Sequence, residues 1–391
     1  MTSHQSSPGS TTRTHPPAVR PARRRLLLPT GLLSVLALAA CGGGGGAGDG
    51  EAGTADTLDA KADLSAQSLV VSNWAGYMPE DLPATFKKAV GPSVEVTEHA
   101  TNEEIVAKLT AGSDSGIDVA FVSGQFAQAL GAQGLLEPVH ADLVPNLKNL
   151  APEATELAYD KGNKYSVPYT WGTTGICYRS DLVQPAPTSW KDLLEPKAEY
   201  RNKITMLGTE RWLMLPAQKA LGFSANTQDE DEMQQVKDLL VKAKPNLLAY
   251  DDTTFYERLI SGEAVMTEAW DGWCNYGTTE NADIKFVVPS EGSDLWADTM
   301  VVLKTSKNKE AAHAFINYVL DAKNQAWAVE NILYNVPNTA AMEQVPAALV
   351  EQYPPLQVTP ADLLEGESLV DLGDAAPLYT RLATEITASK G

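Results

Sequence analysis

The sequence is poor in basic residues. Lys and Arg number 30 against 50 Asp and Glu, which gives a formal net charge of −20. Five of the arginines lie in the first 40 residues, so the rest of the chain carries 25 basic and 50 acidic residues. A surface of this sign repels polyanions, and we therefore expect no nucleic-acid partner. It favours cationic small molecules only weakly, because such acidity often serves solubility.

Signatures of catalysis and of metal binding are missing as well. The chain contains no CxxC, HExxH, CxxC…H or GxSxG motif. Only three histidines follow residue 40, and none lies in a recognisable triad context. We therefore expect no enzyme activity, no cofactor and no resident metal. A hydrolase that pairs Asp298 with Glu268 or Asp271 is the enzyme alternative, although paired carboxylates are a weak signal among 50 acids.

A long apolar run occurs only near the N-terminus. Arg23, Arg24 and Arg25 precede LLLPTGLLSVLALAA (26–40), which has the length of a signal peptide and is short for a transmembrane helix. The run ends in LAAC (38–41), which matches the bacterial lipobox. We expect residues 1–40 to be a signal peptide and Cys41 to be lipidated. A cleaved signal with a chance cysteine is the alternative, and general and twin-arginine export both remain open.

The segment after the signal predicts a tether. Residues 41–67 comprise Cys41 and a stretch rich in Gly, Ala and Asp, which is typical of a flexible linker. The protein is thus expected outside the cytoplasm, in the periplasm or at the outer face of the cytoplasmic membrane, held by its lipid alone. Two further cysteines, Cys177 and Cys274, form either a disulfide or two buried thiols, and the sequence leaves both open.

Strand and helix patterns alternate from residue 68 onward. Apolar runs predict strands at 68–71, 94–96 and 118–122, and periodicity predicts helices at 82–90, from Thr101 onward and at 125–133. This order predicts a parallel or mixed α/β sheet with crossover helices. The length of 391 residues favours two domains, and the β-rich residues 167–179 are a candidate crossing strand between them.

The second half repeats the alternation less regularly. We expect Thr188-Ser189 to cap a helix, further helices at 211–221, 229–243 and 308–320, and strands at 263–268 and 284–288. The stretch EGSDLWADTMVV (291–302) is expected to run as a loop through Asp294 and then as a strand. Alternation along that strand places Trp296 and Asp298 on one face.

Aromatic residues next to loops and carboxylates point to a ligand. An indole face attracts a cation by roughly 0.5–2 kcal/mol, and a carboxylate adds a charge-assisted hydrogen bond. Trp190 and Trp327 lie in helical patterns, and we expect them only to pack. Trp74, Trp270 and Trp296 lie at predicted strand ends, where open α/β sheets bind ligands.

Five motifs, taken in order, resemble one family. They are NW-x-x-Y-x-P (73–79), PYTWGTTGICY (168–178), TSWKDLL (188–194), SEGSDLWADTMVV (290–302) and LYNVPN (333–338). Their order and spacing resemble the spermidine/putrescine-type polyamine-binding proteins of bacterial ABC importers, a group of extracellular solute-binding proteins, over nearly all of 68–389.

The resemblance implies a two-lobed α/β fold of the type II periplasmic-binding-protein kind. Each lobe would be a mixed sheet with flanking helices, and crossing hinge strands would join the two. Lobe 1 would comprise 68–172 plus 298–342, and lobe 2 would comprise 177–293 plus 347–391. Hinge closure would trap the ligand between the lobes.

The resemblance also implies partners and a site. The partners would be a small cationic amine and the permease subunits, and the protein would be a monomer. Aromatic rings would hold the aliphatic chain of a polyamine, and carboxylates would hold its ammonium groups. The implied ligand-binding residues are Trp74, Tyr77, Ser123, Trp270, Trp296, Asp298 and Tyr334, with Asp271 adding charge beside Trp270.

Four positions depart from the family's pattern. Thr209 and Trp212 lie where the family often has acids, Gln125 lies where an aromatic residue is expected, and Leu369 lies where a cleft glutamine is expected. The loss of acids leaves the ligand open among putrescine, spermidine and another cation or zwitterion, such as betaine, choline, 4-aminobutyrate or an opine-like amine. With a zwitterion Arg211 would meet the carboxylate; otherwise we expect Arg211 to be solvated. An iron or anion binder fits less well, because no tyrosine cluster is visible and the charge is acidic.

Overall fold

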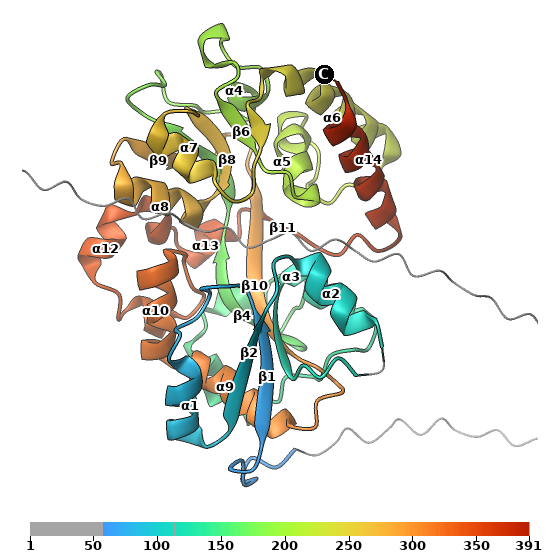
Figure 1. The fold of residues 1–391 in the computed structure, drawn as a ribbon, viewed down its shortest axis with the longest axis vertical. Helices are drawn as coiled ribbons and strands as arrows, with labels where there is room; N and C mark the ends of the chain where they lie inside the picture. Colours follow the sequence, from blue (N-terminus) through green and yellow to red (C-terminus); the bar gives the residue numbers. More distant parts are fainter. Residues whose placement is uncertain (1–57, 113, 391) are drawn as a thin grey trace, which may run out of the picture. The chain divides into compact units, whose positions relative to one another are not determined.

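Two mixed β-sheets form the framework of the protein (Figure 1). The computed structural model describes residues 58–112 and 114–390, so the predicted signal peptide, Cys41 and the linker up to residue 57 lie outside the described residues. No helix in the described part of the chain has the length and apolar character needed to span a bilayer.

The first sheet has the strand order β11-β10-β3-β1-β2, and β4 pairs with β10. Its strands are β1 Ser68–Asn73, β2 Ser93–Glu98, β3 Val119–Ser123, β4 Ser166–Gly172, β10 Asp294–Val302 and β11 Glu367–Ser368. The strand β1 runs parallel to β2 and β3, whereas β10 runs antiparallel to β3 and β4. The predicted mixed sheet with crossover helices is therefore confirmed.

The second sheet has the order β7-β6-β8-β5-β9. Its strands are β5 Thr174–Arg179, β6 Ile204–Met206, β7 Ala249–Tyr250, β8 Met266–Trp270 and β9 Ile284–Val287. The chain passes from β4 in the first sheet to β5 in the second with only Thr173 between them. The crossing strand predicted at 167–179 is thus confirmed, while the exact bounds of the two lobes remain a prediction.

Helices cover both faces of each sheet (Figure 1). Phe86 of α1 packs edge-on against Phe315 of α9 on one side of the first sheet, and a second apolar cluster with Ile105 and Leu130 from α2 and α3 lies on the other. The helices are α1 Leu82–Val90, α2 Asn102–Thr110, α3 Gly124–Ala132, α4 Lys191–Leu194, α5 Glu210–Ala220, α6 Glu230–Ala243, α7 Phe255–Ser261, α8 Asp271–Glu280, α9 Lys309–Val319, α10 Ala322–Ile332, α11 Thr339–Met342, α12 Ala347–Gln352, α13 Pro360–Leu363 and α14 Ala376–Ala388.

Local signals set several helix ends. The side chain of Thr101 accepts a hydrogen bond from the backbone N–H of Glu104 at the start of α2, as its sequence predicts. Gly91, with φ 120°, ends α1, because this backbone conformation suits glycine. The helix predicted after Thr188-Ser189 begins later and is short, with Trp190 rather than Ser189 at its N-cap.

Two expectations about the second half are wrong. The strand β10 begins at Asp294 rather than after it, because Asp294 pairs with Glu367 of β11. Arg211 is neither solvated nor free to meet a ligand. It is 8 % exposed, and its guanidinium donates hydrogen bonds to the carbonyl oxygens of Val370 and Ala225.

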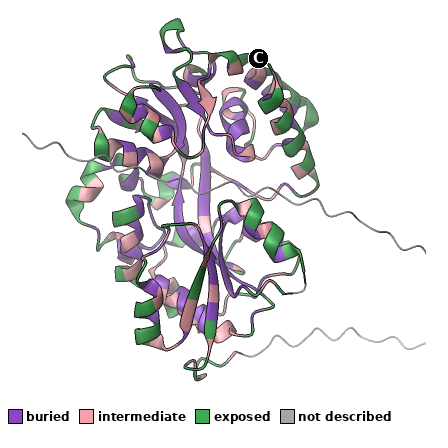
Figure 2. Ribbon diagram, in the orientation of Figure 1, coloured by how far each residue is buried: buried purple, intermediate pink, exposed green. Residues whose placement is uncertain are grey.

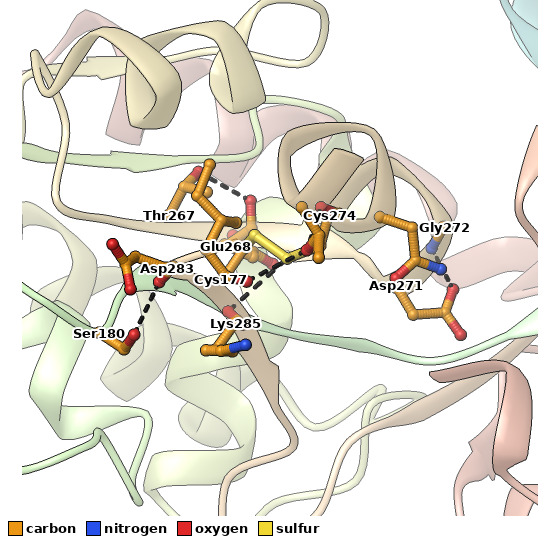
Figure 3. Close-up of a disulfide and its surroundings, with 12 residues drawn as sticks. Cys177, Ser180, Thr267, Glu268, Asp271, Gly272, Cys274, Asp283 and Lys285 are labelled. Carbon is orange, nitrogen blue, oxygen red and sulfur yellow. Dashed lines mark hydrogen bonds between the residues drawn. A yellow bond between two sulfur atoms is a disulfide. The ribbon is translucent and has the colours of Figure 1, made fainter. Parts of the chain in front are cut away.

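A disulfide settles the state of the two described cysteines. Cys177 of β5 and Cys274 of α8 are bonded, and both are fully buried. Figure 3 shows the bond between strand and helix, with Asp271 and Gly272 at the start of the same helix. The bond therefore fixes the helix that carries one of the predicted site residues.

Candidate functional site

The candidate site lies at the central part of β10, which pairs with β3 on one side and with β4 on the other. Asp298 lies opposite Ser123 of β3 and Thr170 of β4. Figure 2 shows that β10 is buried over most of its length, whereas the outer faces of the surrounding helices are exposed. Asp298 itself is half-buried.

Two hydroxyl groups hold the carboxylate of Asp298. Ser123 Oγ donates to Oδ1 at 2.7 Å, and Tyr77 Oη donates to Oδ2 at 2.7 Å. Asn102 fixes Ser123 through its backbone N–H and its hydroxyl. Burial raises the pKa of Asp298, and the hydrogen bonds from Ser123 and Tyr77 oppose this rise. The carboxylate is thus a half-buried acceptor whose two partners are hydroxyl groups, each able to donate and to accept.

Aromatic rings surround this carboxylate. Trp74 packs edge-on against Tyr77 with ring centroids 5.4 Å apart. Trp296 packs edge-on against Tyr334 at 5.0 Å, and Tyr334 lies 6.4 Å from Tyr77. The predicted residues Trp74, Tyr77, Ser123, Trp296, Asp298 and Tyr334 therefore come together from segments far apart in the sequence.

Asp271 reaches this group from the start of α8. A Cβ atom on Gly172 would lie 2.5 Å from Asp271 Oδ1 and 2.5 Å from Trp296 Cζ2, so the glycine makes room for both side chains. Burial raises the pKa of Asp271 to about 8, while hydrogen bonds from the backbone of Gly272 and Thr173 oppose the rise. The predicted carboxylate beside Trp270 thus lies next to Trp296.

Of the other predicted residues, Thr209, Trp212 and Trp270 lie at α5, whereas Gln125 lies in α3. Trp212 packs edge-on against Trp270 with centroids 5.3 Å apart. Thr209 is the N-cap of α5, and its N–H donates to Asp252 Oδ1 at 3.2 Å. Gln125, in the first turn of α3 beyond Ser123, is 5 % exposed.

Asp294 was missed by the sequence reasoning. It is fully buried; Thr174 N–H donates to its Oδ1 at 2.8 Å, and Trp212 Nε1–H donates to its Oδ2 at 2.9 Å. Burial raises its pKa, and these donors oppose the rise. A signal was present, because the alternation that places Trp296 and Asp298 on one face also places Asp294 there.

The carboxylates proposed for a hydrolase have separate partners. Glu268 is fully buried and accepts a hydrogen bond from Leu207 N–H at 3.1 Å. Burial raises its pKa well above the usual value. Asp298 and Asp271 accept from different donors. Within residues 58–112 and 114–390, no group of three or more His, Cys, Asp or Glu is arranged to hold a metal ion.

Two curated polyamine-binding proteins are similar to this chain in sequence. The chain is 34 % identical to the spermidine/putrescine-binding periplasmic protein 1 of Haemophilus influenzae, over 85 % of this chain and 92 % of that protein. It is 30 % identical to the putrescine-binding periplasmic protein PotF of Escherichia coli, over 75 % of this chain and 84 % of that protein.

Two solved structures show the same two-lobed fold. The spermidine/putrescine ABC transporter substrate-binding protein PotD of Streptococcus pneumoniae has a TM-score of 0.72 and 28 % identity, over 83 % of this chain and 100 % of that chain. The Tp0655 (TpPotD) lipoprotein of Treponema pallidum has a TM-score of 0.73 and 26 % identity, over 82 % and 99 %. The expected two-lobed α/β fold is therefore confirmed.

A family model gives the same result. The model described as "Bacterial extracellular solute-binding protein" matches residues 82–357. Proteins of this family bind solutes and are not enzymes, which contradicts the hydrolase alternative and confirms the expectation of no catalytic role. The chain belongs to the bacterial extracellular solute-binding protein family.

Proposed function

We propose that this protein is the substrate-binding component of an ABC importer and binds a polyamine such as putrescine or spermidine between its two lobes. The observation that carries the proposal is Asp298, a half-buried carboxylate held by Tyr77 and Ser123 among aromatic rings. A hydroxyl that donates to the carboxylate can turn to accept from an arriving ammonium group, because it has both a proton and lone pairs. The names of the relatives support the same ligand class.

The aromatic rings suit the remainder of such a ligand. Trp74 and Trp270 are half-buried, so each has exposed ring surface. A cation over an exposed indole face gains about 0.5–1 kcal/mol, and more when water is excluded. The aliphatic carbons of a polyamine gain from apolar burial against the same rings. A carboxylate with aromatic walls therefore matches both parts of the ligand.

A zwitterion is the second candidate, and two unpaired donors favour it. Trp296 Nε1 and Gln125 Nε2 are buried, and neither has an acceptor within the described residues. A ligand carboxylate would accept from such donors, as 4-aminobutyrate or a betaine would. Arg211 takes no part in this candidate, because its guanidinium is enclosed by protein carbonyl groups.

A thermal-shift screen of the purified protein tests the proposal. The panel contains putrescine, cadaverine, spermidine, choline, betaine and 4-aminobutyrate. A ligand that binds the folded state raises the midpoint by mass action, by an amount equivalent to about 2.7 kcal/mol at one hundred times its Kd. We expect the largest shift with a polyamine. The largest shift with 4-aminobutyrate or betaine would favour the zwitterion, and no shift with any of the amines would contradict both candidates.

We also propose that the protein is a monomer anchored outside the cytoplasm by a lipid on Cys41, where it delivers its ligand to permease subunits. The signal and lipobox pattern at 26–41 supports the anchor, and one structural relative is named a lipoprotein. Expression of the Cys41→Ser chain tests it. We expect this variant in the soluble fraction and the unaltered chain with membranes, whereas membrane association of both would contradict the lipid anchor.

A further inference from the structure

The side chain of Asn102 forms two hydrogen bonds with one residue of the candidate site. Asn102 is the first residue of α2, and Ser123 ends β3 and directly precedes α3. The two helices contact each other beside the first sheet (Figure 1). The backbone N–H of Ser123 donates to Asn102 Oδ1 at 2.9 Å, and Asn102 Nδ2 donates to Ser123 Oγ at 3.0 Å. The amide therefore joins the N-termini of two helices at the edge of the site.

These two hydrogen bonds fix the direction of the amide group. A backbone N–H can only donate, so the atom that faces the N–H of Ser123 is the carbonyl oxygen of Asn102. The amide nitrogen then faces Ser123 Oγ and donates to it. Ser123 has a single hydroxyl proton, and its other neighbour is Asp298 Oδ1 at 2.7 Å. The proton of Ser123 therefore points to Asp298, and one lone pair of the hydroxyl is left for a ligand.

Neither Asn102 nor Ser123 uses its side chain to cap the helix that it begins. At α2 the capping oxygen belongs to Thr101, which accepts from Glu104 N–H. A serine at an N-cap usually accepts from a backbone N–H of the first turn, but Ser123 makes no such bond to α3. The needs of the two helices therefore do not explain the hydrogen bonds between Asn102 and Ser123, whereas the contact with Asp298 does.

The other oxygen of Asp298 accepts from a second chain of donors. Tyr77 Oη donates to Oδ2 at 2.7 Å and lies 2.8 Å from Thr170 Oγ1. Because the single proton of Tyr77 is on the Asp298 side, Thr170 donates to Tyr77. Both chains end on the carboxylate, and such donors favour its ionised form. The first donors differ, since the hydroxyl of Thr170 can also accept and the amide nitrogen of Asn102 cannot.

We propose that Asn102 is a positioning residue of the ligand site, which directs the proton of Ser123 to Asp298 and so keeps this carboxylate ready for a cationic ligand. This inference rests on the proposed function and deepens it, because it assigns to Asn102 an effect on affinity that is exerted through Ser123. Burial raises the pKa of Asp298, and the hydrogen bond from Ser123 opposes the rise. Without Asn102 the hydroxyl can turn away, and the pKa of Asp298 should then rise further.

The ligand-free protein provides the first test. NMR of isotope-labelled aspartate carboxyl groups measures the pKa of Asp298, and the Asp298→Asn variant identifies its signal. We expect Asn102→Ala to raise this pKa by about 1 pH unit, which is the order of one hydrogen bond to a charged group. A wild-type pKa in the folded variant would overturn the inference. The measurement needs no ligand, so it also decides the inference if putrescine fails to bind and the proposed function falls.

The affinity for putrescine at two pH values provides the second test. An ammonium group is attracted by the ionised carboxylate, so a raised pKa of Asp298 weakens binding at low pH and has little effect at high pH. We expect Asn102→Ala to bind putrescine roughly 3–10-fold more weakly than the wild type at about pH 5 and within roughly twofold at about pH 8. An equal loss at both pH values would indicate a merely structural role and contradict the inference.

Other titrating groups do not produce this pattern. The phenols of Tyr77, Tyr159 and Tyr334 interact with Asp298, and burial raises their pKa values, so all three stay neutral between about pH 5 and 8. Asp271 is present in both proteins, so its own titration cancels in the ratio of the two affinities.

The Asn102→Asp variant separates the two hydrogen bonds of the amide. Its carboxylate still accepts from the N–H of Ser123 but does not donate to Oγ, and an acid in the first turn of α2 suits the helix dipole. We expect wild-type stability and a pKa of Asp298 at least as high as in Asn102→Ala, because the added negative charge also raises this pKa. A wild-type pKa of Asp298 in this variant would contradict the role of the amide donor.

A double-mutant cycle tests whether Asn102 acts through Ser123. In the Ser123→Ala background, Asn102→Ala should change the pKa of Asp298 by only a small part of its effect in the wild type. An undiminished effect would overturn the proposed route.

Asn308→Ala is the matched control. The amide of Asn308 also donates to a buried carboxylate, that of Asp118 at 3.2 Å, but at the opposite end of β3. This variant should leave the pKa of Asp298 and the affinity for putrescine unchanged. A change equal to that in Asn102→Ala would show that the effect is not specific to Asn102.

Discussion

Asp298 and Asp294 lie four residues apart on one face of β10, and they differ in what holds them. Asp298 accepts from two rotatable hydroxyls, those of Tyr77 and Ser123. Asp294 accepts from the backbone of Thr174, from the hydroxyl of Ser293 and from the indole of Trp212. Asp298 is half-buried and Asp294 is fully buried.

The difference separates a carboxylate that can accept a ligand from one that supports the structure. Burial raises the pKa of both groups, so a raised pKa alone does not identify the binding residue. Exposure separates the two, because Asp298 is half-buried and Asp294 is fully buried. Asp294 in turn accepts the indole N–H of Trp212.

The largest expected effect concerns the disulfide between Cys177 of β5 and Cys274 of α8. The disulfide joins residues 97 apart in sequence and should stabilise the fold by about 4–5 kcal/mol if it acts by constraining the unfolded chain. Replacement of both Cys177 and Cys274 by Ala should lower the free energy of unfolding by that order, as measured by denaturant titration. An unfolding curve that superimposes on that of the wild type would contradict a stabilising disulfide.

A methyl group at Gly172 tests how tightly Asp271 and Trp296 pack against β4. Gly172→Ala should destabilise the protein by about 1–3 kcal/mol, because its Cβ would overlap Asp271 and Trp296 in a buried strand. It should also weaken diamine binding by displacing Asp271. Thermal unfolding and titration with putrescine measure the two effects. Gly112→Ala is the matched control, because nothing lies within 4 Å of its added Cβ; equal behaviour of the two variants would show that Gly172 is not a close contact.

A further expected effect is a slope of stability with pH. The pKa of Asp271 is raised from 3.8 to about 8, so between these values the folded state keeps a proton that the unfolded state loses. Its contribution therefore makes the protein less stable as the pH rises from about 4 to 8. The melting temperature of the wild type should therefore fall relative to that of Asp271→Asn between about pH 5 and 8. A constant difference would show that Asp271 titrates normally.

Much of the fold followed from local patterns. The helix predicted at 82–90 is α1, and the cap predicted at Thr101 is present, since apolar periodicity, glycine and capping residues act over a few residues. Gly292 and Ser293 predict that the loop extends through Asp294. Its strand conformation depends instead on Glu367, which is remote in the sequence. The enclosure of Arg211 depends likewise on Val370 and Asn226.

The site was predicted by resemblance rather than by periodicity. The hydrogen bond between Tyr77 and Asp298 joins residues 221 apart, and no local pattern reveals such a pair. The structure brings the two together with Ser123 and Trp296, while their role in binding remains a prediction. Local sequence patterns could not predict the disulfide either, because its two cysteines are 97 residues apart.

The most direct measurement is calorimetric titration of putrescine into the wild-type protein and the Asp298→Asn variant. Asp118→Asn is a control, because Asp118, which directly precedes β3, is a hydrogen-bonded carboxylate that is buried away from the candidate site. We predict one ligand per chain for the wild type and for the control. We predict an affinity lower on the order of 100-fold for Asp298→Asn, because one partner of a buried charge pair is lost. Equal affinity of Asp298→Asn and wild type would contradict the account.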